Sequence, residues 1–259
     1  MESPEQKLED SPMRFREARL RDYFGLQNDK VLRDPSVTVP PMTPALAAHF
    51  SMFNFEWHVI PAAHTVPFDD RYHGRLYARA PITFTAPSPH HPSARDLLAA
   101  GHRRHQGRTV AVETTMKPAY LHGRAQCYGS AYGYDATADP LAPYLDRAGL
   151  GGTRYGHNYL ALHALTDLIE DDWRARGLLP APYRVTICPP VVFNLIGTVF
   201  HREWSETESL EVGFYVGAHA SAQGFVVGSN GPGDFSYVQI IETATDWKMF
   251  GFRLALVPD

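Results

Sequence analysis

One long amphipathic helix is the feature that most constrains how this chain can fold. The segment 135–155 is rich in Pro and Gly, and Gly177 and Pro180 mark the helix end near residue 176. Between 156 and 176 the apolar residues recur at helical spacing, at Tyr159, Leu162, Leu165, Leu168, Ile169 and Trp173. The pattern predicts a helix with one buried stripe, whose first backbone N–H groups can polarise a carbonyl or hold an oxyanion.

Composition excludes several classes of protein. Of the 259 residues, 44% are hydrophobic and 12% aromatic, which is enough for a buried core. A net charge of -4 argues against nucleic-acid and anionic-membrane partners. The longest apolar run, 191–200, is too short to span a bilayer, and the first ten residues contain no apolar signal region. With only Cys127 and Cys188, the sequence predicts a cytoplasmic protein with buried free thiols.

A second, shorter helix is predicted over 43–58, because Thr43 is a capping residue, Pro44 fits the first turn and apolar residues follow at helical spacing. Residues 1 to about 12 are expected to be frayed, 15–26 give no clear pattern, and a short helix is predicted over 95–104. Strands are predicted over 74–85, 108–116, 123–134, 183–199, 210–217, 223–228, 235–243 and 248–257. A helix followed by strands therefore occurs twice, roughly a hundred residues apart, which suggests a duplicated unit.

Three segments carry a resemblance to a known family: Ala138-Asp-Pro-Leu, Asp146-Arg-Ala-Gly-Leu-Gly-Gly and Tyr155-Gly-His-Asn-Tyr-Leu-Ala-Leu. They resemble the second half of MaoC-like double hot-dog proteins, which include (R)-specific enoyl-thioester hydratases and 3-hydroxyacyl-thioester dehydratases. Residues 183–193 are similar to the strand that follows the family's central helix, and 73–87 with 107–115 resemble its degenerate first hot-dog. The resemblance covers residues 40–243.

The resemblance implies an α+β double hot-dog, with one repeat in residues 1–136 and the other in 137–259. Each repeat would be an antiparallel sheet wrapped around one helix. The catalytic pair of the family is missing, however. Aligned on Pro140 and Leu141, Thr137 and Ala142 stand where the family has its catalytic Asp and His, and Asp139 stands where it has Asn. Either the chemistry is rebuilt from nearby groups, or only ligand binding remains.

The nearby groups with suitable chemistry are His157 and Asp139 as general acid or base, with Tyr155 and Asp135 in reserve. At the predicted helix start, the positive end of the dipole favours a neutral imidazole at His157 that can act as a base. Each candidate also has a structural interpretation, as a turn, capping, packing or solvated residue. The substrate-binding candidates are Gly156, Asn158 and Gly152.

The expected function is an enzyme acting on an acyl thioester, carried by CoA or an acyl carrier protein, in fatty-acid or polyketide metabolism. The expected chemistry is that of a dehydratase or hydratase: a base removes the Cα proton, helix-start N–H groups hold the enolate-like oxygen, and an acid protonates the leaving hydroxyl. One alternative is a catalytically degenerate acyl-binding or interaction protein. Another is thioester hydrolysis or cyclisation on the same scaffold. The acyl chain, the carrier and the oligomeric state stay open, with a homodimer as one option.

No cofactor is expected. The sequence contains no Gly-x-Ser-x-Gly elbow, no phosphate-binding or dinucleotide glycine loop and no His-Glu-x-x-His. His157 and His163 are six residues apart and do not share a helix face, which disfavours a metal site there. The remaining cluster, His90, His91, His102 and His105, is predicted to lie in a solvated loop. We therefore expect neither a metal nor a flavin.

Overall fold

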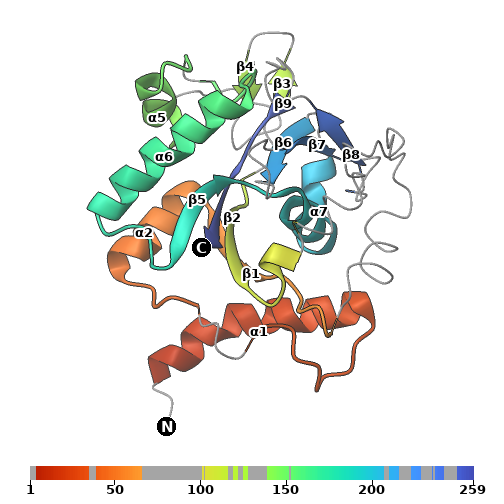
Figure 1. The fold of residues 1–259 in the computed structure, drawn as a ribbon. Helices are drawn as coiled ribbons and strands as arrows, with labels where there is room; N and C mark the ends of the chain where they lie inside the picture. The colour runs from red at the N-terminus through yellow and green to blue at the C-terminus, as the bar shows by residue number, and fades with distance from the viewer. Residues whose placement is uncertain are drawn as a thin grey trace.

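Among the described residues, helices combine with two four-stranded sheets and one two-stranded sheet, mostly antiparallel, in this α+β protein (Figure 1). The structure is a computed structural model that describes residues 4–34, 39–65, 101, 103–115, 119–121, 125–127, 139–151, 153–206, 210–215, 223–228, 235, 237–241 and 250–259. Its described helices are α1 (Pro4–Phe24), α2 (Pro44–Phe53), α5 (Ala142–Arg147), α6 (Tyr159–Ala175), α7 (Pro190–Val199) and the 3-10 helix η3 (Arg202–Glu206). Its described strands are β1 (Phe55–Val59), β2 (Thr109–Glu113), β3 (Ala119–Leu121), β4 (Ala125–Cys127), β5 (Tyr183–Ile187), β6 (Leu210–Tyr215), β7 (Gln223–Gly228), β8 (Tyr237–Ile241), β9 (Phe250–Gly251) and β10 (Leu254–Pro258).

The first sheet joins strands from both predicted repeats. Its order is β1-β2-β10-β5, and every neighbouring pair is antiparallel. Ala111 of β2 pairs with both Trp57 of β1 and Leu256 of β10, and Leu256 pairs in turn with Val185 of β5. Strands that follow α2 and α6 therefore form the two edges of one continuous sheet.

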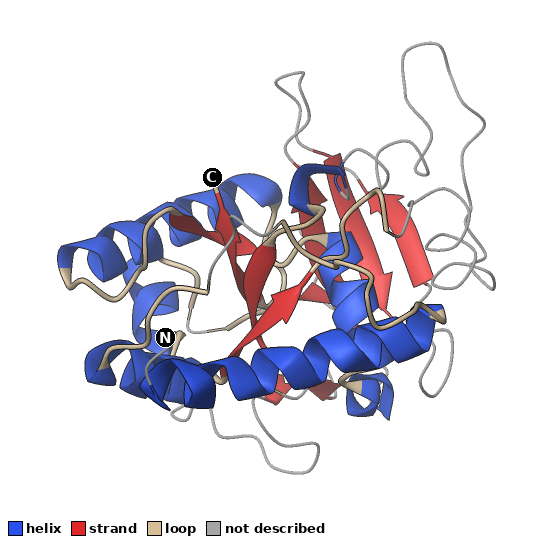
Figure 2. Ribbon diagram, turned by 90° about the horizontal axis from the view of Figure 1, so that it is seen from below, coloured by secondary structure: helices blue, strands red, loops and turns tan. Residues whose placement is uncertain are grey.

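The two faces of this sheet carry different helices. Successive residues of a strand point to opposite faces, so Phe55 and Trp57 share one face of β1, and Glu56 and His58 share the other. Phe55 and Trp57 contact the ring of Phe50 in α2. On the other face, α1 packs along β1, and Figure 2 shows α1 running beneath the strands.

Trp173 is the centre of the core between α2, α6 and the sheet. Its side chain is fully buried, and its ring lies 4.3 Å from His49, 5.0 Å from Phe53 and 6.0 Å from Phe55, measured between ring centroids. Its indole Nε1 donates to the hydroxyl of Tyr144 in α5, at 3.0 Å. One residue of the predicted apolar stripe therefore connects α6 to α2, α5 and β1.

Two predicted boundaries in the first half of the chain are wrong. The N-terminus is not frayed to residue 12, because α1 begins at Pro4 and buries Met13, Leu20 and Phe24 on one face. The helix predicted over 43–58 ends at Phe53, although its cap is as expected, with Leu46 N–H donating to Thr43 Oγ1 at 3.2 Å. Asn54 adopts a left-handed conformation (φ 51) and ends the helix, because that conformation terminates helical hydrogen bonding.

The prediction of one strand over 183–199 is also wrong for residues 190–199, which form a helix. The segment divides into β5 and the helix α7, which begins after the extended Pro189 with Pro190 in its first turn. A short apolar run rich in Val does not distinguish a strand from a buried helix, whereas proline at the first helical position favours the helix. Helix α7 packs on the second sheet, where Gly197 lies so close to the ring of Phe235 that an added Cβ would approach its carbons to 3.0 Å.

The second sheet has the order β8-β7-β6-β9. The strand predicted over 223–228 is confirmed as β7, and it pairs antiparallel with β6 and β8. Strands β6 and β9 pair in parallel. The strand predicted over 74–85 and the repeat boundary at 136 lie outside the described residues, and of 123–134 only β4 is described. None of the described helices has the length and apolar character needed to cross a membrane.

Replacing Trp173 by Ala should lower the free energy of unfolding by about 3–5 kcal/mol, the usual cost of truncating a large buried aromatic residue. The matched control is Leu160→Ala, because Leu160 lies on the same helix with 74% of its surface exposed. That control should change stability by less than about 0.5 kcal/mol. Urea unfolding of the two variants measures both effects, and equal losses would contradict this account of the core.

His105 is 3% exposed and helical, so the prediction that it lies in a solvated loop is wrong. Together with the buried His49, it should make the fold sensitive to acid. Burial lowers the pKa of His49 to about 4 and that of His105 to about 3, so both are neutral in the folded protein at neutral pH. The unfolded chain takes up these protons below a pH of about 6.5, so stability falls as pH drops from there toward 4, by up to about 1.4 kcal/mol per pH unit for each histidine. His105→Gln should reduce that slope in pH-dependent urea unfolding, and an unchanged slope would contradict this account of its burial.

Candidate functional site

The helix start differs from the prediction. Helix α6 begins at Tyr159, and Asn158 is its N-cap, with Oδ1 accepting from Ala161 N–H at 3.1 Å. Gly156 has a positive φ of 79 and lies before the helix, where its N–H donates to the carbonyl of Phe250 at 3.4 Å. The expectation that Gly156 and His157 form the first helical turn is therefore wrong, because Asn158 is the cap and the helix begins three positions later than predicted, at Tyr159.

Tyr155 and His157 belong to a local turn around Thr153. His157 Nε2 lies 2.7 Å from the carbonyl oxygen of Thr153, which can only accept, so Nε2 carries the proton in this contact. Tyr155 is 6% exposed, and its backbone N–H donates to Thr153 Oγ1 at 3.2 Å. Asp135 and Gly152 lie outside the described residues.

Asp139 is held in a buried ion cluster. The guanidinium of Arg154 donates to Asp139 Oδ2 from Nε at 2.7 Å and to Asp139 Oδ1 from Nη2 at 2.8 Å. The same guanidinium donates to both carboxylate oxygens of Glu113, at 2.8 and 2.7 Å. Arg154, Asp139 and Glu113 are each 2% exposed or less. Burial alone lowers the pKa of Arg154, but the charges of Asp139 and Glu113 raise it well above its ordinary value.

A second buried arginine extends this ion cluster to the other sheet. Arg253 donates to both carboxylate oxygens of Glu211 in β6, at 2.7 and 2.6 Å. Its Nη1 also donates to the backbone carbonyl of Glu113 at 2.9 Å, and its guanidinium carbon lies 3.6 Å from the ring centroid of Trp204. Asp139 is thus part of the framework that joins β2, β6 and the segment before β10.

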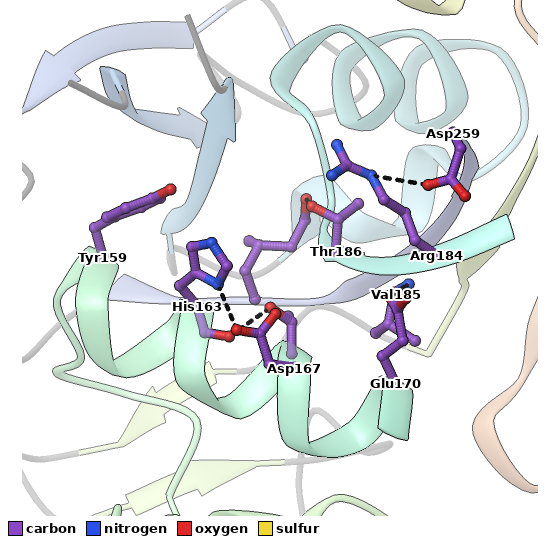
Figure 3. A pocket seen from close by; sticks show the side chains of 10 residues that line it. Tyr159, His163, Asp167, Glu170, Arg184, Val185, Thr186 and Asp259 are labelled. Carbon is purple, nitrogen blue, oxygen red and sulfur yellow. Dashed lines mark hydrogen bonds and ion pairs between the residues drawn. The ribbon is translucent and has the colours of Figure 1, made fainter. Parts of the chain in front are cut away.

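A cavity of about 270 Å³ lies between α6 and β5 (Figure 3). Its α6 wall begins at Tyr159, the first helical residue, and runs for about three turns. Its other wall comes from β5 and Asp259. The lining residues are Tyr159, His163, Thr166, Asp167, Glu170, Arg184, Val185, Thr186, Ile187 and Asp259.

The most reactive pair in this cavity is His163 and Asp167. His163 Nδ1 lies 3.1 Å from Asp167 Oδ2, and the two side chains, from successive turns of α6, point toward one another (Figure 3). They are 51% and 66% exposed, so a ligand in the cavity can reach them. The ring of Tyr159 meets that of His163 edge-on, with the centroids 5.6 Å apart.

The opposite wall supplies a cation. Arg184 of β5 points toward Asp259, and its Nε lies 4.0 Å from Asp259 Oδ1 (Figure 3). That Nε is buried and makes no hydrogen bond to the residues that the structure describes. The cavity therefore offers a proton-transfer pair on α6 and a hydrogen-bond donor on β5.

The sequence analysis did not predict that His163, Asp167 and Arg184 share a site, although the spacing of His163 and Asp167 could have been noticed. His163 and Asp167 are four residues apart, a spacing that places two side chains on one helix face. Arg184 could not be assigned to the same site, because only the packing of α6 on β5 brings it there. A different group, Glu56, His58 and His201, has ligand atoms that could hold a metal ion.

Arg154→Gln and Asp139→Asn should each lower the free energy of unfolding by about 3–5 kcal/mol, since each leaves a buried charge without its partner. The double variant should lose less than the sum of the two, because both changes break one interaction. Arg176→Gln is the control, because Arg176 forms an exposed ion pair with Asp172 and its loss should cost far less than either buried change. Additive losses in urea unfolding would show that Asp139 and Arg154 do not act as a pair.

No protein-family model, curated protein or solved structure matches this chain. The argument about function therefore depends on the chemistry of the site itself.

Proposed function

We propose that this protein is an enzyme acting on an acyl thioester of CoA or an acyl carrier protein, with dehydratase or hydratase chemistry in the cavity between α6 and β5. The observation that carries the proposal is the His163–Asp167 pair in that cavity, 3.1 Å apart and accessible to a ligand. The pair lies on the helix to which the sequence resemblance assigns the site, one to two turns beyond the residues first considered.

The pair can perform both proton transfers of the reaction. Asp167 accepts the Nδ1 proton of His163, which leaves the lone pair of the neutral imidazole on Nε2. Nε2 removes the Cα proton of a 3-hydroxyacyl thioester, and the resulting imidazolium returns that proton to the departing hydroxyl. The products are an enoyl thioester and water, and the reverse sequence hydrates the double bond. Asp167 orients the imidazole and stabilises its charged form.

The developing negative charge on the thioester oxygen needs a donor, and Arg184 provides one from the facing wall. The Arg184 side chain lines the cavity and is 33% exposed, so its guanidinium can donate to a carbonyl oxygen. The volume of about 270 Å³ is at the lower end of ordinary ligand cavities, roughly 300–1,000 Å³. We therefore propose a short acyl group, with the rest of its carrier outside the cavity.

Within the α+β class, we propose that the fold is a double hot-dog. Its support is the repeated order of helix and strand in the first sheet, where α2 leads into β1 and α6 leads into β5. Each of these strands pairs with a later strand, β2 or β10, and the two halves meet where β2 pairs with β10. This arrangement is what edge-to-edge joining of the proposed repeats 1–136 and 137–259 would produce.

His163→Gln and Asp167→Asn should each lower the turnover number by about 10²-fold or more, the scale expected for loss of a general acid or base. His64→Gln and Asp171→Asn make the same chemical changes at exposed positions outside the cavity and should leave turnover unchanged. The assay is a panel of 3-hydroxyacyl and enoyl thioesters of CoA, with loss or gain of the conjugated double bond followed by absorbance.

The other outcomes of that assay contradict the proposal. Binding of the thioesters without turnover by the wild-type protein would favour an acyl-binding protein, and release of a free thiol would favour hydrolysis. If turnover survives in His163→Gln but is lost in His157→Ala, the general acid or base is His157, in the segment before α6.

A further inference from the structure

A second group of polar side chains, Glu56, His58 and His201, lies on the face of the first sheet opposite α6. Glu56 and His58 are two residues apart on β1 and point to the same face, while Phe55, on the other face, contacts Trp173 of α6. His201 follows the end of α7, where the neighbouring Phe200 ring lies 4.9 Å from that of His58. Strand β1 and the segment after α7 therefore bring two imidazoles and one carboxylate together.

The distances within this group suit a single ion. Glu56 Oε2 lies 3.5 Å from His58 Nε2 and 3.5 Å from His201 Nε2, and the three ligand atoms lie within 4.8 Å of one another. Tetrahedral zinc with bonds of about 2.0–2.1 Å separates its ligand atoms by roughly 3.4 Å. Small side-chain movements would complete that geometry.

Three buried ring nitrogens of this group make no hydrogen bond to the described residues: both nitrogens of His58, which is 0% exposed, and Nε2 of His201. The two Nε2 atoms each lie 3.5 Å from Glu56 Oε2, at ion-pair distance. Buried polar atoms are normally satisfied, because each one left unpaired costs free energy. A metal ion between the two Nε2 atoms would use both lone pairs.

His201 is also oriented in the way that metal-binding histidines are. Its other nitrogen, Nδ1, lies 2.8 Å from Glu203 Oε1. Its ring stacks on that of Trp204, with centroids 4.8 Å apart and planes 9° from parallel. A carboxylate on Nδ1 fixes the tautomer that presents the Nε2 lone pair to a metal.

We propose that Glu56, His58 and His201 bind one zinc ion through a carboxylate oxygen and two Nε2 atoms. Two histidines and one glutamate are a zinc ligand set in which the fourth position is open. Glu56 is 34% exposed at its side chain and His201 is 14% exposed, so solvent can reach the group from the side of Glu56, and a water could fill the fourth position. This site is independent of the thioester chemistry proposed at α6.

Arg16 of α1 competes with the metal. Its Nη2 lies 2.6 Å from Glu56 Oε2, the oxygen that faces both histidines. Its side chain is 18% exposed, so it can turn toward solvent when a cation enters. Removing the arginine charge should therefore strengthen metal binding, which is the opposite of what loss of a ligand does.

The test is a metal titration of the full chain after treatment with EDTA. Co²⁺ is followed by its visible absorption, and Zn²⁺ by competition with bound Co²⁺. The wild-type protein should bind one ion per chain. Glu203→Gln should weaken binding by roughly 10–100-fold, the usual cost of an outer-shell partner, and Glu56→Gln and His201→Gln should weaken it further. Arg16→Gln should tighten it by about tenfold or more.

Two results would overturn the site. One is the absence of stoichiometric binding by the wild-type protein. The other is unchanged affinity in Glu56→Gln and His201→Gln, which would place the metal on other histidines. His64→Gln, at an exposed position outside both sites, is the control that should bind as the wild type does, and far-UV circular dichroism checks that every variant is folded. Because the readout is metal binding, failure here leaves the thioester proposal standing, and failure of that proposal leaves this site standing.

Discussion

The pairing of Arg154 with Glu113 and Asp139 is the interaction on which the rest of the structure depends. One guanidinium makes two charge-assisted hydrogen bonds to each carboxylate, and all three side chains are buried. Glu113 Oε2 also accepts from the backbone N–H of Leu254, at the start of β10. The position of α5, the end of β2 and the start of β10 are therefore fixed by one cation, and an unpaired member would be costly in this environment.

The second buried arginine, Arg253, forms a similar ion pair with a residue of the second sheet. Arg253 is held by Glu211 of β6 and lies over the ring of Trp204, so β6 is tied to the segment that enters β10. Asp139 was expected to act as a general acid or base, but it accepts hydrogen bonds from Arg154 within this ion cluster and holds the fold together. Asp139 lies beside Arg154 because a buried charge is stable only when an opposite charge neutralises it.

The proposed sites lie at opposite edges of the first sheet, whose strand order is β1-β2-β10-β5. At one edge, α6 and β5 enclose a cavity with an exposed His163–Asp167 pair. At the other edge, β1 and the end of α7 hold Glu56, His58 and His201, with α1 alongside. Side chains alternate along β1, so Trp57 faces α2 while its neighbours Glu56 and His58 face α1. The two proposals can therefore fail independently.

The sequence by itself determined the elements whose signals lie within a few residues. The apolar stripe ending at Trp173, the cap at Thr43 and the strand 223–228 all follow from local periodicity and capping chemistry. Only the tertiary structure decided which charges pair and which side chains meet. Arg154 and Glu113 are 41 residues apart, and His201 is separated from β1 by most of the chain, so no spacing could join them. The strength of such contacts depends on distance and burial, which packing sets after the local elements have formed.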